Sequence, residues 1–466
     1  MVRFPVSFCS TCSLALTVLA GCSQIDAPAL PQTLPGQWQQ QVAQPASAAP
    51  TVDLHGWWKS FNDPVLDKLL ARAVSDNLTL AQASSRLKQA RALTRQTDAD
   101  YLPQLSLATR SSEEVSATDT FFQISLDAVW DLGLFGAREG AEKQAEARIK
   151  QAKAEQQAAQ VTVVSEVVRQ YLELRAAQQQ IQTLEALAAL DQKALALLDI
   201  RIPSHLASPD QRLQLQAQQA ETLARLAQPR QVQARALQSL AALLGQTSPD
   251  ASWNTVQPLP RIKQVSVQQV PSDLLRTRPD IQRAEADVLQ AAGELGLAHA
   301  NLYPHVALGT SYLYAYNMTM HEKVRSNSVP MVGPIIDLPI FNWGQRKAAE
   351  KAQKYAMKAA LQGYRQVLLD SVAQTEAALA AFGQEQERVT HLQQAEAALD
   401  ERAQHGLTLT QLGLTSQWEQ LDAQRDQLQA SLQLTTAQAR RSLAFVALYK
   451  ALGGAPLPAG AGEKHT

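Results

Sequence analysis

Four short stretches of the chain alternate between apolar and polar positions, as β-strands with one apolar face do. They cover residues 103–112, 122–131, 305–314 and 332–340. In the second stretch every other residue is apolar: Phe122, Ile124, Leu126, Ala128 and Trp130. Each stretch is close to the roughly 9–11 residues with which a tilted strand crosses a bilayer. The alternation therefore predicts four strands, which suit a membrane but also fit a soluble sheet.

Between these strands the apolar positions follow the 3.6-residue period of helices. Residues 137–200 and 346–405 contain no proline. Each of these two stretches predicts a helix of about 60 residues, which is about 90 Å long at 1.5 Å per residue. Two shorter helices are expected at about 75–100 and 209–244. The pattern predicts a mainly helical protein in which each half contains one strand pair and one long helical hairpin.

Several landmarks occur twice along the chain, and the second copy follows the first at nearly constant spacing. The offsets are 201, 206 and 208 residues for three pairs of landmarks: Leu102-Pro103 and Tyr303-Pro304, Trp130–Phe135 and Ile336–Phe341, and Leu244-Gly245 and Leu452-Gly453. An internal duplication of about 200 residues accounts for this order. We therefore predict two repeats, at 57–250 and 251–455, followed by a C-terminal tail at 456–466.

The N-terminus has the features of an export signal. A short start that carries one charge, Arg3, leads into the apolar run 14–21, which is too short to span a bilayer. Leu19-Ala20-Gly21-Cys22 resembles a bacterial lipobox, which implies that residues 1–21 are a signal peptide and that Cys22 carries lipid. Ser23 follows, where an Asp would retain a lipoprotein in the inner membrane, so the resemblance implies an outer-membrane anchor. An ordinary signal peptide with a chance cysteine is the alternative. Residues 22–56, rich in Pro, Ala, Gln and Ser, predict a tether.

The composition excludes several classes of function. The net charge of −1 argues against nucleic acid as a partner. No phosphate-binding glycine loop and no His-Glu-x-x-His motif occurs, so we expect no catalytic residues, no cofactor and no enzyme activity. The one cluster of soft metal ligands, Met318-Thr319-Met320-His321, suits Cu(I) or Ag(I). It falls between two predicted strands, where an exposed loop is the simpler interpretation, and we assign no metal site.

Four strands cannot close a barrel by themselves. An open sheet edge in hydrocarbon would leave backbone groups without hydrogen bonds. Two copies would give eight strands, whose interior is filled by side chains. Three copies would give twelve strands, whose mostly polar second face suits a water-filled bore. The geometry therefore favours a homotrimer.

Five motifs, together with the lipobox, connect the chain with a known family. In order they are Trp57–Leu66 (WWKSFNDPVL), Leu275–Glu285 (LRTRPDIQRAE), Leu338–Gly344 (LPIFNWG), Leu421–Arg425 (LDAQR) and Leu448–Gly454 (LYKALGG). Over nearly the whole mature chain this set resembles the TolC-like outer-membrane efflux proteins, in the lipoprotein branch often labelled NodT. The resemblance implies a mainly α fold with a membrane β-barrel, in which a trimer forms a 12-stranded β-barrel continued by a periplasmic α-barrel.

The same resemblance implies a function and partners. The protein would be the exit duct of a tripartite efflux system, passing drugs or other small molecules from the periplasm to the exterior. Its partners would be outer-membrane lipid, a periplasmic adaptor protein and an inner-membrane pump, typically of the resistance-nodulation-division class.

A gate can be assigned by residue through this resemblance. In relatives, the Asp and Arg of the LDAQR motif lie near the periplasmic tip and help to close the pore. They correspond to Asp422 and Arg425, with an apolar ring position at Trp418. These spacings place all three on one helical face, and a ring of three aspartates would favour cations. A solvated charged face with ordinary i, i+3 pairing is the alternative.

The two hairpin turns differ from those of relatives, which usually carry Arg-Tyr-x-x-Gly. The first turn reads Arg201–His205 (RIPSH), and the second keeps Gly413 but has Thr408-Leu409. The resemblance places the adaptor at these turns, so the identity of the partner is left open.

Three other functions compete with drug efflux. Export of Cu or Ag would use the soft-ligand cluster, and type I protein secretion could use the same architecture. A non-conducting coiled-coil scaffold anchored by lipid would explain the helices but would leave the four strands without a role.

Overall fold

The computed structural model of the protein describes residues 28–30, 54–113, 120–262, 277–318, 322–323 and 331–454. The predicted signal peptide, Cys22, most of the predicted tether and the C-terminal tail lie outside these residues. So do residues 319–321 of the soft-ligand cluster.

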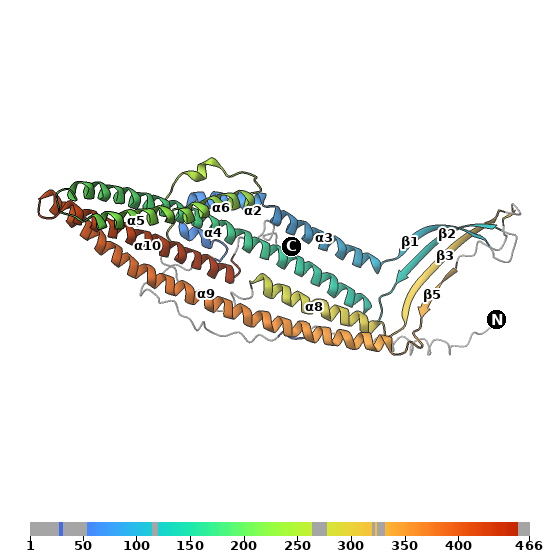
Figure 1. The fold of residues 1–466 in the computed structure, drawn as a ribbon. Helices are drawn as coiled ribbons and strands as arrows, with labels where there is room; N and C mark the ends of the chain where they lie inside the picture. Colours follow the sequence, from blue (N-terminus) through green and yellow to red (C-terminus); the bar gives the residue numbers. More distant parts are fainter. Residues whose placement is uncertain are drawn as a thin grey trace, which may run out of the picture. The chain divides into compact units, whose positions relative to one another are not determined.

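The chain is mainly helical with one antiparallel sheet, as predicted (Figure 1). Its helices and strands, in order, are η1 (Trp57–Phe61), α2 (Pro64–Asp76), α3 (Leu78–Asp100), β1 (Gln104–Glu113), β2 (Thr120–Asp131), α4 (Ala137–Arg201), α5 (Pro209–Arg225), α6 (Ala227–Leu243), η2 (Ala251–Asn254), α8 (Pro279–Ala300), β3 (His305–Asn317), β4 (Glu322–Lys323), β5 (Met331–Asp337), α9 (Gln345–Gln411) and α10 (Gln417–Ala451). None of the described helices is long and apolar enough to cross a membrane.

The chain divides into two compact units. The first combines Ser85–Glu155 and Asp280–Leu368 with the N-terminal Met1–Gln32, and the second combines Thr33–Ser84, Gln156–Pro279 and Leu369–Thr466. Helices α4 and α9 each contribute to both units. The first unit contains the sheet. The second contains the turns that connect α4 to α5 and α9 to α10, and the main apolar core.

The sheet of the first unit has the order β1-β2-β3-β4, and β5 also pairs with β3. Its register aligns the alternating positions of neighbouring strands. Leu126 on β2 pairs with Leu107 on β1 and with Tyr312 on β3, so apolar side chains share one face. All three are exposed, which leaves the apolar face of the sheet uncovered by the described chain.

Polar residues align on the opposite face of the sheet. Asp127 pairs in register with Ser106 and Ser311. Its carboxylate accepts hydrogen bonds from the hydroxyls of Ser311 at 2.6 Å and Ser125 at 2.8 Å. The predicted division into one apolar and one mostly polar face is therefore confirmed.

The fourth predicted strand is shorter than expected, because β5 ends at Asp337 rather than at residue 340. Pro339, which has no N–H to donate, follows two residues later. Strand β4, which pairs with the end of β3 at Tyr316 and Asn317, was not predicted.

In the first unit α4 and α8 approach each other at glycines. A Cβ atom on Gly293 would lie 2.7 Å from the carbonyl oxygen of Gly140, which is too close for any side chain. Gly140, near the start of the predicted long helix, is therefore a packing position and does not break α4.

The core of the second unit surrounds Trp57, which is fully buried. Its ring stacks on Tyr449 with centroids 5.6 Å apart and packs edge-on against Phe445 at 6.0 Å. The Trp57 indole also donates a hydrogen bond of 3.2 Å to the carbonyl oxygen of Gly454. These contacts join η1 to the end of α10.

Two of the family motifs meet at the same end of α10. The guanidinium of Arg278 donates to the carbonyl oxygen of Ala451, and to the side-chain oxygen of Gln374 at 3.0 Å. A Cβ atom on Gly453, which has a φ of 76°, would lie 3.2 Å from the Cα of Arg278. In this structure these motif residues cap a helix and pack closely, which is a structural role.

Two predicted helices contain a break. Asn77 separates α2 from α3, and its side chain accepts hydrogen bonds from the N–H groups of Thr79 and Leu80, as N-cap residues do. Leu226 separates α5 from α6, with Pro229 in the first turn of α6. The two long helices extend slightly beyond their predicted ends, to Arg201 and Gln411.

Candidate functional site

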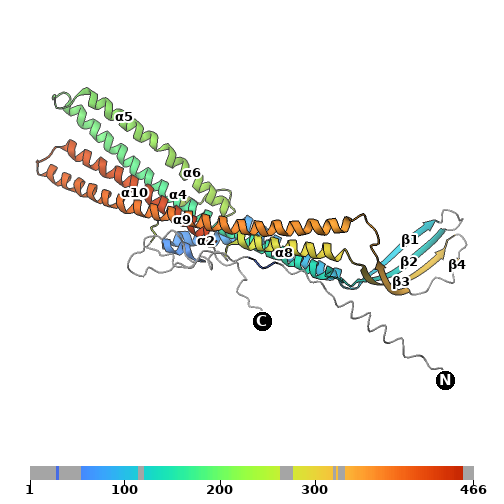
Figure 2. The same cartoon turned by 90° about the horizontal axis from the view of Figure 1, so that it is seen from below.

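Two helical hairpins of the second unit end in short turns, one between α4 and α5 and one between α9 and α10 (Figure 2). Ser208 and Ser416 begin α5 and α10 with capping boxes, each of which satisfies two free backbone N–H groups. In the second turn, hydrogen bonds from Thr415 and Ser416 hold the pKa of the Glu419 carboxyl below its usual value. Both turns are therefore defined by local sequence.

The two turns reverse the chain with different residues. Gly413 has a φ of 71° in the second turn, whereas His205 takes the corresponding left-handed conformation in the first, with a φ of 56°. This conformation is uncommon for a residue with a side chain. Both turns also expose large aliphatic side chains: Ile200, Leu206, Leu412 and Leu414.

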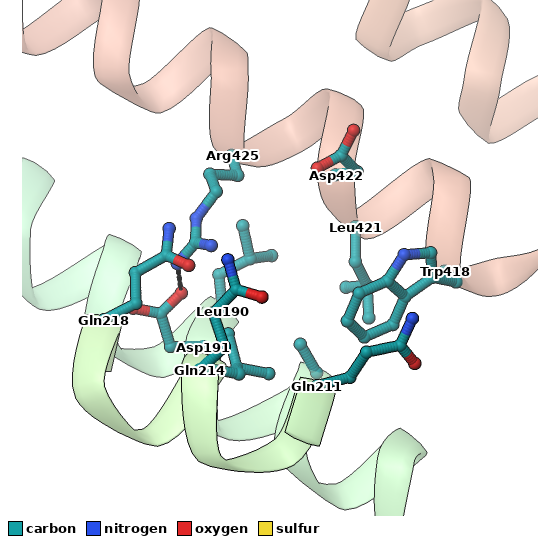
Figure 3. Close-up of a pocket in the computed structure, with 11 residues that line it drawn as sticks. Leu190, Asp191, Gln211, Gln214, Gln218, Trp418, Leu421, Asp422 and Arg425 are labelled. Atoms are coloured by element: carbon teal, nitrogen blue, oxygen red, sulfur yellow. Dashed lines mark hydrogen bonds and ion pairs between the residues drawn. The ribbon is translucent and has the colours of Figure 1, made fainter. Parts of the chain in front are cut away.

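Close to these turns the start of α10 packs against α4 and α5. Leu421 of α10 lies in an apolar cluster with Leu190 and Leu198 of α4 and Leu215 of α5, and Trp418 packs against its edge. A cleft of about 210 Å³ opens beside this cluster. Figure 3 shows Trp418, Asp422 and Arg425 on one side of the cleft and residues of α4 and α5 on the other.

An ion pair between Arg425 and Asp191 crosses the cleft (Figure 3). The side chain of Asp191 is 1% exposed, and that of Arg425 is 14% exposed. The hydroxyl of Thr222 donates a second hydrogen bond to Asp191 at 3.2 Å. Burial raises the pKa of the Asp191 carboxyl, while Arg425 and Thr222 oppose that shift. The pair therefore joins the two hairpins through a carboxylate whose negative charge depends on Arg425.

Asp422 lies at the rim of the same cleft and is largely exposed. Its carboxylate is 3.9 Å from Arg402 of α9, and Arg402 also pairs with Asp426 at 2.7 Å. Trp418 lies beside the first turn, because the guanidinium carbon of Arg201 is 5.9 Å from the centre of its indole ring. Among the described residues, Asp422 and Arg425 each pair with another helix and not with one another.

The structure thus brings the three predicted gate residues to one cleft. Their orientation toward a bore stays a prediction. Asp191 and Arg402 were missed by the sequence analysis, which named Arg201 only as part of the first turn. Asp191 could have been found, because it is an acid within the apolar stripe of its helix, between Leu187 and Ala194.

Only one residue of the soft-ligand cluster lies within the described structure. Met318 is exposed at the end of β3, and the other three residues of the cluster lie outside the described structure. Within the described ranges, no group of three or more His, Cys, Asp or Glu side chains is arranged to hold a metal ion.

The sequence and the fold are both similar to those of known proteins. Residues 69–246 and 270–454 match the family model described as outer membrane efflux protein. The nodulation protein T of Rhizobium leguminosarum bv. viciae is 27% identical over 433 residues, which cover 90% of this chain and 86% of that protein. The pyoverdine export outer membrane protein OpmQ of Pseudomonas putida is 29% identical over 473 residues, covering 95% and 96%. The solved structure of the outer-membrane channel OprN superimposes with a TM-score of 0.79 at 26% identity, covering 92% and 99%.

Proposed function

The chain belongs to the outer membrane efflux protein family and is an outer-membrane exit duct of a tripartite efflux system, and we propose that the cleft at its hairpin turns is the gate of that duct. Members of this family are transport components that work with an adaptor and an inner-membrane pump. The protein extends from the outer membrane into the periplasm.

The observation that carries the gate proposal is the Arg425–Asp191 pair, which joins α10 to α4. Separation of the two hairpins would require this pair to break and Trp418 to leave the apolar cluster. Asp422, which is exposed at the rim, would act on passing ions through its charge. Trp418, Asp422 and Arg425 would then face the lumen near the periplasmic end.

The working unit is a homotrimer. Within the described sheet, β1 and β5 each pair with a single neighbour, and the apolar face is uncovered. Strand addition between copies would satisfy both edges and close a 12-stranded barrel. The exposed aliphatic residues of the two hairpin turns would meet the adaptor, and the pump would be of the resistance-nodulation-division class.

The remaining assignments are also proposals. Residues 1–21 are the signal peptide, and Cys22 is the lipidated N-terminus at the start of the tether, residues 22–56. The repeats cover 57–250 and 251–455. The cargo is a drug or another small molecule. No particular compound is assigned, because the two named relatives differ in their stated roles at similar identity. Copper or silver export and type I protein secretion are the alternatives.

The gate is tested by changing Asp422 and Arg425 together to Ala. Neither residue belongs to the apolar clusters of the described chain, so the trimer should assemble normally. Single-channel conductance in planar bilayers and leakage of bulky antibiotics into cells should both increase. A control with the exposed pair Glu146 and Lys150 of α4 changed to Ala should conduct like the wild type. If the gate variant also conducts like the wild type, the gate lies elsewhere.

A further inference from the structure

The cleft at the hairpin turns contains polar groups that the Arg425–Asp191 pair does not use. The Nε atom of Arg425 is buried and has no hydrogen-bond partner within the described structure. Gln214 and Gln218 line the cleft, and among the described residues their amide groups make no side-chain hydrogen bond. A buried donor without a partner is uncommon in folded proteins and calls for an explanation.

The size and walls of the cleft favour a flat, partly apolar molecule. Its volume of about 210 Å³ exceeds the roughly 150 Å³ of an apolar cavity that takes up benzene. Leu190, Leu215 and Leu421 supply apolar walls, and Trp418 offers an indole ring against which another ring can pack. Two fused aromatic rings suit this combination.

The charges in the cleft favour a neutral molecule. Asp191 and Arg425 neutralise one another, and Asp422 at the exposed rim lies beside Arg402, so a charged guest would bring a charge without a counter-charge into the buried part of the cleft. The Nε–H of Arg425 and the amides of the two glutamines can donate to an acceptor. We propose that this cleft binds small, uncharged, planar aromatic compounds that carry a carbonyl oxygen or a similar hydrogen-bond acceptor.

Such a ligand would bias the channel toward its closed state. It would contact α10 on one side and α4 and α5 on the other, and these contacts exist only while the hairpins are together. This effect rests on the proposed gate, whereas the binding itself does not.

Binding can be tested with 1-naphthamide and the full-length trimer in lipid nanodiscs, using equilibrium dialysis corrected with empty nanodiscs. The expected Kd is about 1 mM, as for other ligands of this size. The matched charged probes 1-naphthoate and 1-naphthylmethylammonium should bind about tenfold more weakly, because the buried part of the cleft offers neither charge a free counter-charge.

Two variants test the location of the site. Leu215→Trp fills the cleft from a residue that is 5% exposed and should weaken binding of 1-naphthamide at least about tenfold. Its control is Leu213→Trp on the same helix, which is 62% exposed and should bind like the wild type. Arg425→Lys keeps the positive charge beside Asp191 but removes the Nε–H, and should also weaken binding about tenfold. The lysine variant carries the test if Leu215→Trp fails to form trimers.

Equal binding to the wild type, Leu215→Trp and Arg425→Lys would overturn the proposal, as would equal binding of the neutral and charged probes. In planar bilayers, 1-naphthamide should lower the open fraction of the wild type but not that of Leu215→Trp. If binding is confirmed but the open fraction does not change, the site exists and its coupling to the gate is wrong. Failure of the Asp422 and Arg425 variant to alter conductance would instead refute the gate and leave the binding result standing.

Discussion

The ion pair between Asp191 and Arg425 is asymmetric, and this makes a specific prediction for its variants. Asp191 is 1% exposed, whereas Arg425 is 14% exposed and so is nearer to solvent. Burial raises the pKa of Asp191, so its charge depends on the opposing effect of Arg425. We expect Arg425→Gln to open the channel more than Asp191→Asn, because it leaves a buried carboxylate without a counter-charge.

The size of the difference follows from the two environments. Removing one partner of a buried pair costs about 3–5 kcal/mol, and we take about 3 kcal/mol for Arg425→Gln because Thr222 still donates to Asp191. Asp191→Asn removes a charge but keeps an acceptor, which costs about 1 kcal/mol. The difference of about 2 kcal/mol is a factor of about 30 in the ratio of closed to open channels.

The measurement is the open fraction of single channels in planar bilayers at pH 7. The double variant should resemble Asp191→Asn and not Arg425→Gln, because neither charge then remains in the cleft. Equal effects of the two single variants, with an additive double variant, would refute this account of the pair.

The pH dependence of Arg425→Gln provides a second check. Without Arg425, the pKa of Asp191 in the closed state should rise further above its ordinary value of 3.8. The closed state then holds the proton more tightly than the open state. Closure is therefore fully restored below the ordinary pKa and is lost as the pH rises through the raised pKa. In Arg425→Gln combined with Asp191→Asn, closure should not depend on pH in this range.

Three further predictions concern other parts of the chain. Trp57→Phe should lower the free energy of unfolding by about 1–3 kcal/mol, because the buried carbonyl oxygen of Gly454 loses its donor. Trp343→Phe, at a position 90% exposed, should have no effect. Thermal inactivation of the trimer measures both. Ser416→Ala should destabilise the start of α10 by about 1 kcal/mol through loss of its capping box, with faster amide exchange confined to that turn. Cys22→Ala should abolish lipidation and mislocalise the protein, whereas mass spectrometry of the wild type should show an acylated Cys22 without residues 1–21.

The periodic part of the fold was predictable because each element repeats its own signal. Alternation identified β1, β2 and β3 to within three residues, and the absence of proline identified α4 and α9. The breaks at Asn77 and Leu226 were missed because each involves one residue and does not disturb the apolar period of its neighbours. Strand β4 has only two residues, which is too short for any alternation to be detected.

The contacts of the proposed gate residues were not predictable in the same way. Arg425 and Asp191 are 234 residues apart, and no local pattern connects them. The family motif indicated a role for Arg425, and the apolar stripe of α4 contained one acidic residue, Asp191. Only the packing of α10 on α4 shows that the two side chains meet. The left-handed conformation of His205 was equally hidden, since the first turn lacks the glycine that usually marks it.

The packing also separates two residues that the LDAQR motif presents together. Residues three apart on a helix differ by about 60° in direction, which is enough to place Arg425 inside the cleft and Asp422 at its exposed rim. A carboxylate at the rim acts mainly through its charge, which salt screens, whereas a guanidinium bound to a buried carboxylate holds two helices together. High salt should therefore reduce any ion preference due to Asp422 and have little effect on closure through Arg425. The two residues of one motif would then divide selectivity and closure between them.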